Sequence, residues 1–345
     1  MQAVPKIRFR DAQIEMAHGA GGKASRRLVE GLFAPLLGDP SAGPLGDAAY
    51  VQMNGTRLAI TTDSFVVKPL RFPGGSIGEL AVNGTVNDLA VSGARAETLV
   101  VSYILEAGLP SEILEQEVRA MAAAARRAGV AIAGGDTKVV EHGKADGMYI
   151  SSCGIGRLIK GVEVSAKSVR PGDRILLSGP IGDHGITILL ARGELDFEAE
   201  ICSDTRSVLP LVEAMAAAAA PGIRWMRDPT RGGVATSLNE LALDCGLGIC
   251  LEEEQIPIHD SVRGACELLG LEPMHIANEG QFLAVVAPEF AEAALAALRA
   301  APGGQAAVPI GEVRAQPAAT VLVSTLYGGT RVIDMLVGDP LPRIC

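Results

Sequence analysis

The fold of this chain is decided by residues 76–105, which read SIGELAVNGTVNDLAVSGARAETLVVSYIL. A helical pattern covers residues 76–94, and a β-type run follows at once over residues 97–105. Further β-type runs lie at 57–63, 130–136 and 148–156, and a second helical pattern lies at 111–129. The alternation predicts an α/β or α+β first domain.

A domain boundary is expected near residues 167–173, where SVRPGD supplies Pro and Gly before a new strand at 174–179. The second half repeats the alternation, with helical patterns at 183–193, 208–220, 232–246 and 289–301 and strands at 248–254, 281–287 and 306–313. The last β-type runs cover residues 320–329 and 331–337. We therefore assign residues 1–165 to an N-terminal domain and residues 166–337 to a C-terminal α/β domain.

The bulk composition limits the classes of function. A chain of 345 residues exceeds what one hydrophobic core usually supports, and its formal net charge of −10 disfavours a nucleic-acid partner. The N-terminus lacks the apolar core of a signal peptide, and no apolar run reaches the length of a bilayer, so we expect a cytoplasmic protein with no membrane partner.

The last residue is a cysteine, Cys345, and it ends the segment GDPLPRIC at residues 338–345. Two prolines block regular pairing there, so we expect an extended, mobile tail that could reach on the order of 20 Å. The other five cysteines form no CxxC pair and are expected to behave as small core residues.

A glycine-rich loop, HGAGGKAS, occupies residues 18–25 and leads into a helical pattern. Backbone N–H groups of such a loop can surround phosphate oxygens, which makes His18, Gly21, Gly22 and Lys23 candidate nucleotide-binding residues. The segment matches neither the P-loop pattern nor GxGxxG, and a plain flexible turn remains the alternative.

Four aspartates stand at the ends of apolar runs: Asp47, Asp63, Asp136 and Asp228. Loops at strand ends are where α/β folds place ligands, and converging carboxylates suit Mg²⁺ on a nucleotide. The alternative for each aspartate is that it caps a turn or a helix.

The helix expected at 76–94 carries Glu79, Asn83 and Asn87 at every fourth position, with Asp88 beside them. These residues share one polar face amid apolar neighbours, and asparagines are poor helix formers, so the face indicates a site. A solvated face is the alternative.

The segment DPTRGG, residues 228–233, makes a tight entry to the next helix and places Arg231 at its start. A helix N-terminus with an arginine can neutralise phosphate, although turn construction alone also explains the Pro and Gly residues.

Together these segments resemble the hydrogenase maturation carbamoyl dehydratases, called HypE, within the superfamily of aminoimidazole ribonucleotide synthetase and selenophosphate synthetase. The resemblance covers nearly the whole chain. It rests on AHGAGG, TTDSFVVKPLRFPGG, GTVNDLAVSGA, GGDTKVVE, GDHG, DPTRGGV, ANEG and the terminal PRIC, of which the last is the most specific.

The resemblance implies a two-domain aminoimidazole ribonucleotide synthetase-like fold and a homodimer, in which the N-terminal domains share a β-barrel. It implies ATP under the glycine-rich segment, with Thr137 of GDTK as a further binding candidate. It also implies Mg²⁺ on Asp63, Asp88 and Asp228, with Asp47 and Asp136 as further candidates.

The implied activity is ATP-dependent dehydration of a carbamoyl group on Cys345 to a thiocyanate. A partner carbamoyltransferase would load the group, and the cyanide would pass to iron on a hydrogenase assembly scaffold. By similarity, Glu279 of ANEG would be the base and Lys138 its electrostatic partner. The alternative for Glu279 is a structural ion pair, and the alternative for Lys138 is a phosphate contact.

Two other functions remain open from the sequence. One is a related enzyme that phosphorylates a small molecule, such as selenophosphate synthetase, which carries its reactive residue near the N-terminus; here no cysteine precedes Cys153. The other is a non-catalytic assembly protein whose tail tethers a partner.

Overall fold

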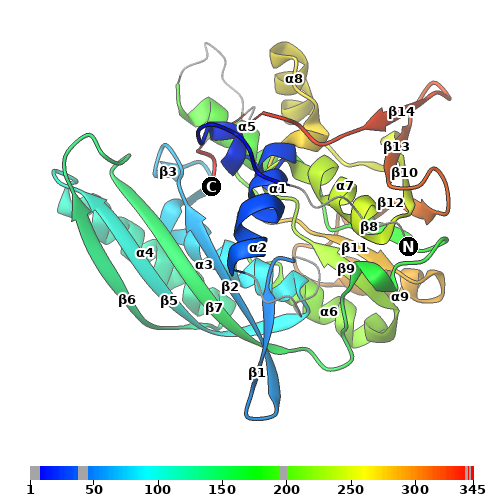
Figure 1. The fold of residues 1–345 in the computed structure, drawn as a ribbon, viewed down its shortest axis with the longest axis horizontal. Coiled ribbons are helices and arrows are strands. Elements are labelled where there is room, and N and C mark those ends of the chain that lie inside the picture. Colours follow the sequence, from blue (N-terminus) through cyan, green and yellow to red (C-terminus); the bar gives the residue numbers. More distant parts are fainter. Residues whose placement is uncertain (1–7, 38–45, 194–199, 339–340, 342) are drawn as a thin grey trace.

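The structure is a computed structural model that describes residues 8–37, 46–193, 200–338, 341 and 343–345. Its described strands form a five-stranded sheet, a seven-stranded sheet and a two-stranded ribbon (Figure 1). The first sheet is built from residues 49–158 and the second from residues 174–333. The domain boundary expected near residues 167–173 falls between the two sheets. The end of the N-terminal domain at residue 165 stays a prediction.

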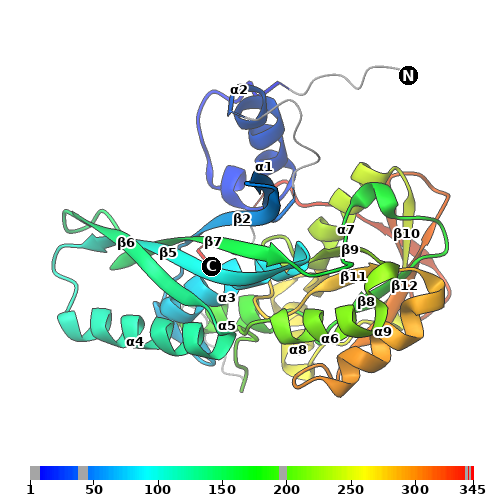
Figure 2. The ribbon, with the colours of Figure 1, turned by 90° about the horizontal axis from the view of Figure 1, so that it is seen from below.

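The five-stranded sheet has one covered face. Its strands, in spatial order, are β1 (Ala49–Met53), β2 (Thr56–Phe65), β7 (Met148–Leu158), β5 (Ala94–Glu106) and β6 (Ala131–Val140). Neighbours pair antiparallel except β5 with β6. The helices α3 (Ile77–Val91) and α4 (Ser111–Ala128) lie along the same face of the sheet (Figure 2). The opposite face carries Val100 and Ile104, which remain exposed in the single chain.

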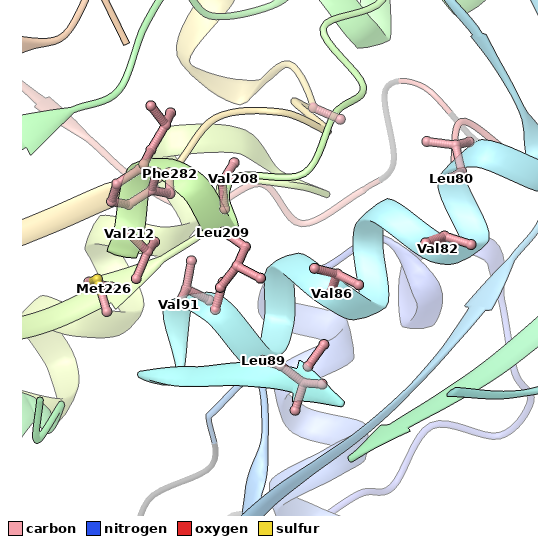
Figure 3. Packing of buried hydrophobic residues seen from close by; sticks show 14 of the residues in the cluster. Leu80, Val82, Val86, Leu89, Val91, Val208, Leu209, Val212, Met226 and Phe282 are labelled. Atoms are coloured by element: carbon pink, nitrogen blue, oxygen red, sulfur yellow. The ribbon is translucent and has the colours of Figure 1, made fainter. Parts of the chain in front are cut away.

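Helix α3 is buried almost along its whole length because it packs on both halves of the molecule. Val91 lies beside Leu209 of the second half (Figure 3). Leu89 instead packs on the first sheet, because a Cβ atom at Gly154 would lie 2.9 Å from its Cδ1 atom. Asn83 and Asn87 are buried with it, at 5% and 1% exposure. The solvated-face interpretation of this helix is therefore wrong for these two residues.

The seven-stranded sheet is covered on both faces. Its strands, in spatial order, are β14 (Thr330–Ile333), β13 (Thr320–Ser324), β10 (Gly248–Glu252), β12 (Val308–Arg314), β8 (Arg174–Leu177), β11 (Leu283–Val286) and β9 (Ile223–Arg227). Along β11, Leu283 and Val285 join the cluster around α7 (Gly233–Cys245), whereas Ala284 and Val286 join the cluster that contains α6 (Leu209–Ala219) and α9 (Pro288–Ala300). Burial on both faces explains why this strand reads as a continuous apolar run.

Further elements lie outside the two large sheets. The N-terminal segment forms a 3-10 turn (Met16–Gly19), α1 (Lys23–Leu28), one π-helical turn (Val29–Phe33) and α2 (Ala34–Leu37), and it projects from the body beside β2 (Figure 2). Helix α5 (Asp183–Ala191) lies near the C-terminus, and α8 (Asp260–Leu269) packs against it (Figure 1). The ribbon consists of β3 (Arg71–Phe72) and β4 (Gly75–Ser76).

Most of the expected elements are confirmed within the described residues. The sequence patterns did not predict β1, β9 or the short ribbon, whose strands are two to five residues long, and they did not predict α8. The β-type run expected at 320–329 ends at Ser324, where a turn that contains Gly328 at φ +80° begins. None of the described helices is long and apolar enough to cross a membrane.

Candidate active site

Three carboxylates converge where the two halves of the chain meet. Asp47 precedes β1, Asp88 lies in the last turn of α3 and Asp228 follows β9; one oxygen atom from each lies within 4.8 Å of those from the other two. The Thr61 hydroxyl group donates a hydrogen bond to the Asp88 carboxylate at 2.8 Å. We call Asp47, Asp88 and Asp228 the acidic cluster.

Burial and mutual repulsion make this cluster costly without a cation. Burial, followed by the charge of Asp47, raises the pKa of Asp228 to about 8. Burial and the charges of Asp228 and Asp47 also raise the pKa of Asp88 well above its usual range. Arg227 contacts Asp47 at 3.0 Å but also pairs with Glu240 at 3.1 Å, so its charge is shared. An all-oxygen donor set with excess negative charge fits Mg²⁺.

Asp63, Glu279 and Arg231 surround the acidic cluster. Burial raises the pKa of Asp63, and the nearby Arg231 guanidinium opposes that rise. Glu279 is 3% exposed, and its pKa is raised by burial and then by Asp63 and Asp228. These mutual influences mean that Asp63 and Glu279 lie close enough to the acidic cluster for the charges to affect one another. A buried carboxyl group whose pKa is raised by burial and by neighbouring charges is typical of groups that take part in proton transfer.

The backbone around Glu279 is held by two side chains, the half-buried Asp204 and the buried Asn87. The Asp204 carboxylate accepts hydrogen bonds from the N–H groups of Glu279 and Gly280, both at 3.0 Å. The Asn87 side chain donates to the Glu279 carbonyl oxygen at 3.2 Å and accepts from the Val208 N–H group at 2.8 Å. Asn87 therefore connects the backbone of Glu279 to the backbone of Val208 in this structure. A direct contact between Asn87 and a nucleotide stays a prediction. Asn83, one turn earlier, reaches Thr205 at 3.5 Å.

The glycine-rich loop packs directly on the DPTRGG segment. A Cβ atom at Gly21, whose φ is +75°, would lie 2.8 Å from the Arg231 carbonyl oxygen, and one at Gly22 would lie 2.2 Å from the Leu336 carbonyl oxygen. The Arg231 side chain donates to the Gly19 carbonyl oxygen at 2.9 Å. These glycines are thus required for close packing, which holds the loop beside the acidic cluster.

Two other residues of this loop have protein partners. His18 is buried and contacts Asp11 through Nε2 at 2.8 Å, while its Nδ1 accepts the Glu15 N–H group at 2.9 Å. The Lys23 ammonium group pairs with Asp334 at the surface. Their assignment to ATP stays a prediction.

The GDTK residues lie elsewhere. Asp136, Thr137 and Lys138 are on β6, three strand spacings from β2, which is about 14 Å. The Lys138 side chain is 71% exposed and pairs with Asp136 at 2.9 Å. Within one chain the structure does not bring these residues to Glu279 or to the acidic cluster.

The C-terminal cysteine lies against the body of the protein. A Cys345 carboxylate oxygen accepts the Val66 N–H group at 2.8 Å, and Ile344 forms a β-bridge with Val67. Val66 follows Asp63 by three residues of extended chain, which corresponds to about 10 Å. The structure thus brings Cys345 toward the carboxylates. Residues 339, 340 and 342 lie outside the described residues, and the expected mobility of the tail stays a prediction.

Sequence reasoning missed three residues of this region. Asp204 and His184 support the ANEG loop and the tail, and Arg227 pairs with the acidic cluster. His184 stands within the GDHG motif that the resemblance rests on, so that motif could have indicated it. For Asp204 and Arg227 we find no signal in spacing or periodicity.

Known proteins match the chain along almost its full length. The family AIR synthase related protein, N-terminal domain, matches residues 45–158, and the corresponding C-terminal domain family matches residues 170–324. The carbamoyl dehydratase HypE of Azotobacter vinelandii is 49% identical over 340 residues, which are 99% of each chain.

Two solved structures are also similar. A HypE–HypF complex has a TM-score of 0.84 and 44% identity, covering 90% of this chain and 99% of that chain. A hydrogenase maturation protein HypE in complex with ATP has a TM-score of 0.80 and 45% identity, covering 96% of this chain and 100% of that chain.

Proposed function

Because the chain belongs to the HypE carbamoyl dehydratase family, we propose that it removes water from a carbamoyl group carried on its own Cys345, at the expense of ATP. Its fold is the mixed α/β, two-domain fold of the AIR synthase related proteins. The observation that carries the proposal is the position of Cys345, whose carboxylate accepts a hydrogen bond from the N–H group of Val66, the residue that follows the strand bearing Asp63. The role is the maturation of hydrogenase.

The chemistry explains the need for ATP. The carbamoyl oxygen attacks the γ-phosphorus and ADP leaves, which turns a poor leaving group into phosphate. Two protons then leave the nitrogen, the C–O bond breaks as phosphate departs, and a C≡N bond forms on sulfur. An amide oxygen is a weak nucleophile, so catalysis depends on positioning and on charge stabilisation.

The residues of the site divide this work. Glu279 is proposed as the base that removes a nitrogen proton, because it is buried, next to the acidic cluster and held by Asp204. Asp63, Asp88 and Asp228 are the proposed ligands for Mg²⁺, and Asp47 stands beside them. When bound there, Mg²⁺ supplies positive charge to the phosphates of ATP.

Lys138 can assist Glu279 only if a second chain supplies it. The outer face of the five-stranded sheet leaves Val100 and Ile104 exposed, and Ile104 pairs with Lys138 across the β5–β6 register. We propose a homodimer in which two such faces close a shared barrel. Asp136, Thr137 and Lys138 of one chain then contribute to the ATP site of the other.

The wider pathway follows from the relatives. One HypE has been solved with HypF, so we propose that a carbamoyltransferase of that kind loads Cys345. The thiocyanate then passes its cyanide to an iron-carrying assembly scaffold. These steps are assigned to the cytoplasm.

The test uses the intact protein. The thiol is carbamoylated with cyanate, Mg-ATP is added, and the mass of the C-terminal peptide 339–345 is measured, with Cys345→Ala as the control. We expect that peptide to lose one water only when ATP is present. If the carbamoyl group persists while ATP is hydrolysed, the proposal is wrong, and phosphorylation of a small molecule becomes the better explanation.

A further inference from the structure

The C-terminal tail is held by two side chains at opposite ends of α5. The His184 Nε2 atom lies 2.6 Å from the Ile344 carbonyl oxygen, and the Arg192 guanidinium donates to the Arg343 carbonyl oxygen at 2.8 Å. Arg192 also donates to the Lys68 carbonyl oxygen at 3.1 Å, which ties the tail to the chain that follows β2. The Lys68 N–H group itself donates to the Arg343 carbonyl oxygen at 3.3 Å.

These contacts fix the backbone of the tail. Three successive residues, Arg343, Ile344 and Cys345, are bound through their carbonyl or carboxylate oxygens. Leu341 and Ile344 are 4% and 5% exposed, so two apolar side chains anchor the same segment. Bonds to consecutive backbone groups set the register of the chain, and a one-residue slip would turn the terminal side chain to the opposite side.

The glycines of the GDHG motif allow α5 to pack closely on the C-terminal tail. A Cβ atom at Gly185 would lie 3.2 Å from Leu341 Cδ1 and 2.5 Å from Ile276 Cγ2, so a larger residue would collide with Ile276 and crowd the tail. Gly182 immediately precedes α5, and its φ of +90° is a backbone conformation that favours glycine. Asp183 pairs with His259 on the outer side, at 2.9 Å.

The hydrogen bonds of His184 identify its tautomer. A carbonyl oxygen can only accept, so Nε2 carries the proton, and Nδ1 accepts from the Ser203 hydroxyl group at 2.7 Å. The ring is buried, and burial lowers the pKa of His184 to about 4, so the ring stays neutral at physiological pH. Phe72 packs edge-on against it.

We propose that His184 is a positioning residue that sets where the Cys345 sulfur lies during dehydration, with Arg192 securing the residue before Ile344. This rests on the proposed function. The contact also links the tail to the base: Ser203, which orients His184, is followed by Asp204, which holds the backbone of Glu279. The segment Ser203–Asp204 therefore helps to position both the Cys345 thiol, through His184, and Glu279.

The experiment compares His184→Ala, His184→Gln and Arg192→Ala with the wild-type protein. Gln keeps an N–H donor near the position of Nε2. Two rates are measured: water loss from S-carbamoylated Cys345 at saturating Mg-ATP, and alkylation of the unmodified Cys345 by iodoacetamide, both read on peptide 339–345. Thr187→Val is the matched control, because it alters a buried hydroxyl group on the same helix that has no hydrogen-bond partner among the described residues.

We expect His184→Ala to slow water loss by about tenfold or more, because small displacements of reacting groups reduce rates strongly. Alkylation should accelerate, the affinity for ATP should stay unchanged, and His184→Gln should recover most of the rate. Arg192→Ala should show the same changes to a smaller extent. Because the Arg192 side chain lies at the surface, this variant replaces His184→Ala in the comparison if His184→Ala does not fold. Thr187→Val should match the wild type.

Unchanged water loss and unchanged alkylation in His184→Ala, or in Arg192→Ala if the former does not fold, overturn the positioning role. A parallel loss of ATP affinity and thermal stability that His184→Gln does not rescue also overturns it. If the wild-type protein itself loses no water, the proposed function fails. The alkylation rates still decide whether His184 holds the tail.

Discussion

The acidic cluster and the β6 edge are both rich in sequence signals, yet the fold completes only one of them within a single chain. Asp47, Asp88 and Asp228 meet between the two halves of the molecule and are largely screened from water. Asp136 and Lys138 lie on an exposed edge strand and pair with each other. Residues that are equally conspicuous in the sequence can therefore either meet in the fold or stay apart from the other candidates.

The electrostatics of the two regions differ accordingly. Burial and like charges raise the pKa of Asp228, so the cluster gains stability from a cation. At the edge, the hydrogen bond from Lys138 lowers the pKa of Asp136, so that carboxylate is already compensated. The cluster therefore suits a bound cation, whereas the carboxylate at the edge is neutralised by its own ion pair.

The largest effect is expected from Asp228→Asn. Removing a carboxylate from the cluster should lower ATP-dependent water loss by about a thousandfold, because the charge that holds Mg²⁺ on the phosphates is lost. The metal-free protein should be at least as stable as the wild type, since repulsion is relieved. Turnover and thermal unfolding with and without Mg-ATP check both points.

Asp244→Asn is the control for Asp228→Asn, because Asp244 lies in the last turn of α7, where it pairs with Arg26. A variant at Asp228 that retains Mg-ATP stabilisation would remove this residue from the proposed ligands.

Next in size is the effect of Glu279→Gln and Lys138→Ala, each of which should lower water loss by about a hundredfold while ATP still binds. If Lys138 serves the partner chain, mixing the two inactive variants regenerates one intact site in each mixed dimer. Roughly a quarter of wild-type activity should then return after subunit exchange.

Persistent inactivity of the mixture, with exchange verified by mass, would place Lys138 and Glu279 in the same site of one chain. Wild-type activity of Glu279→Gln alone would eliminate Glu279 as the base.

A smaller effect is expected from Val100→Asp on the outer face of the first sheet. Val100 is 46% exposed in the single chain, and a second copy would bury it. An unpaired charge there should weaken dimerisation by about 2 kcal/mol, or about thirtyfold. Sedimentation measures the association.

Val118→Asp is the matched control, since Val118 is a similarly exposed valine on α4. Equal weakening in both variants would argue against the shared barrel.

The smallest effect on turnover, about fivefold, is expected from Asp204→Asn. The two carboxylate oxygens accept one N–H group each from Glu279 and Gly280, and the Asn side chain keeps only one acceptor oxygen. Burial raises the pKa of Asp204 to about 6, above its value in the unfolded chain. The folded state thus binds the proton more tightly, and stability falls as pH rises from about 4 to about 6.

Asp204→Asn should flatten that part of the stability profile, by at most about 3 kcal/mol. Denaturant unfolding across this pH range measures it, with Asp260→Asn as a control at the start of α8. A profile identical to that of the wild type would show that Asp204 does not titrate there.

Much of the fold was predictable because periodicity reports burial. The helical pattern at 76–94 became α3 and the apolar run at 281–287 became β11, since long amphipathic or fully buried segments depend little on their neighbours. The amphipathic α8 was missed, and so were β1 and β9, whose registers are set by the strands beside them.

The site was predictable only in part, for the same reason. A position at the end of an apolar run indicated Asp47, Asp63 and Asp228. The same signal also indicated Asp136, which lies on the edge strand β6. Strand order decides which strand ends meet, and no local pattern in the sequence encodes it.

By itself, the sequence determined the alternation of elements, the terminal cysteine and the motifs that mark the family. The tertiary structure decided that Asn83 and Asn87 are buried supports, that His184 holds the tail, and that Lys138 stands apart from Glu279. Local sequence sets conformation through the dihedral preferences and hydrophobic spacing of neighbouring residues. Convergence of side chains about 200 residues apart, such as Asn87 and Glu279, depends instead on long-range packing of the whole chain.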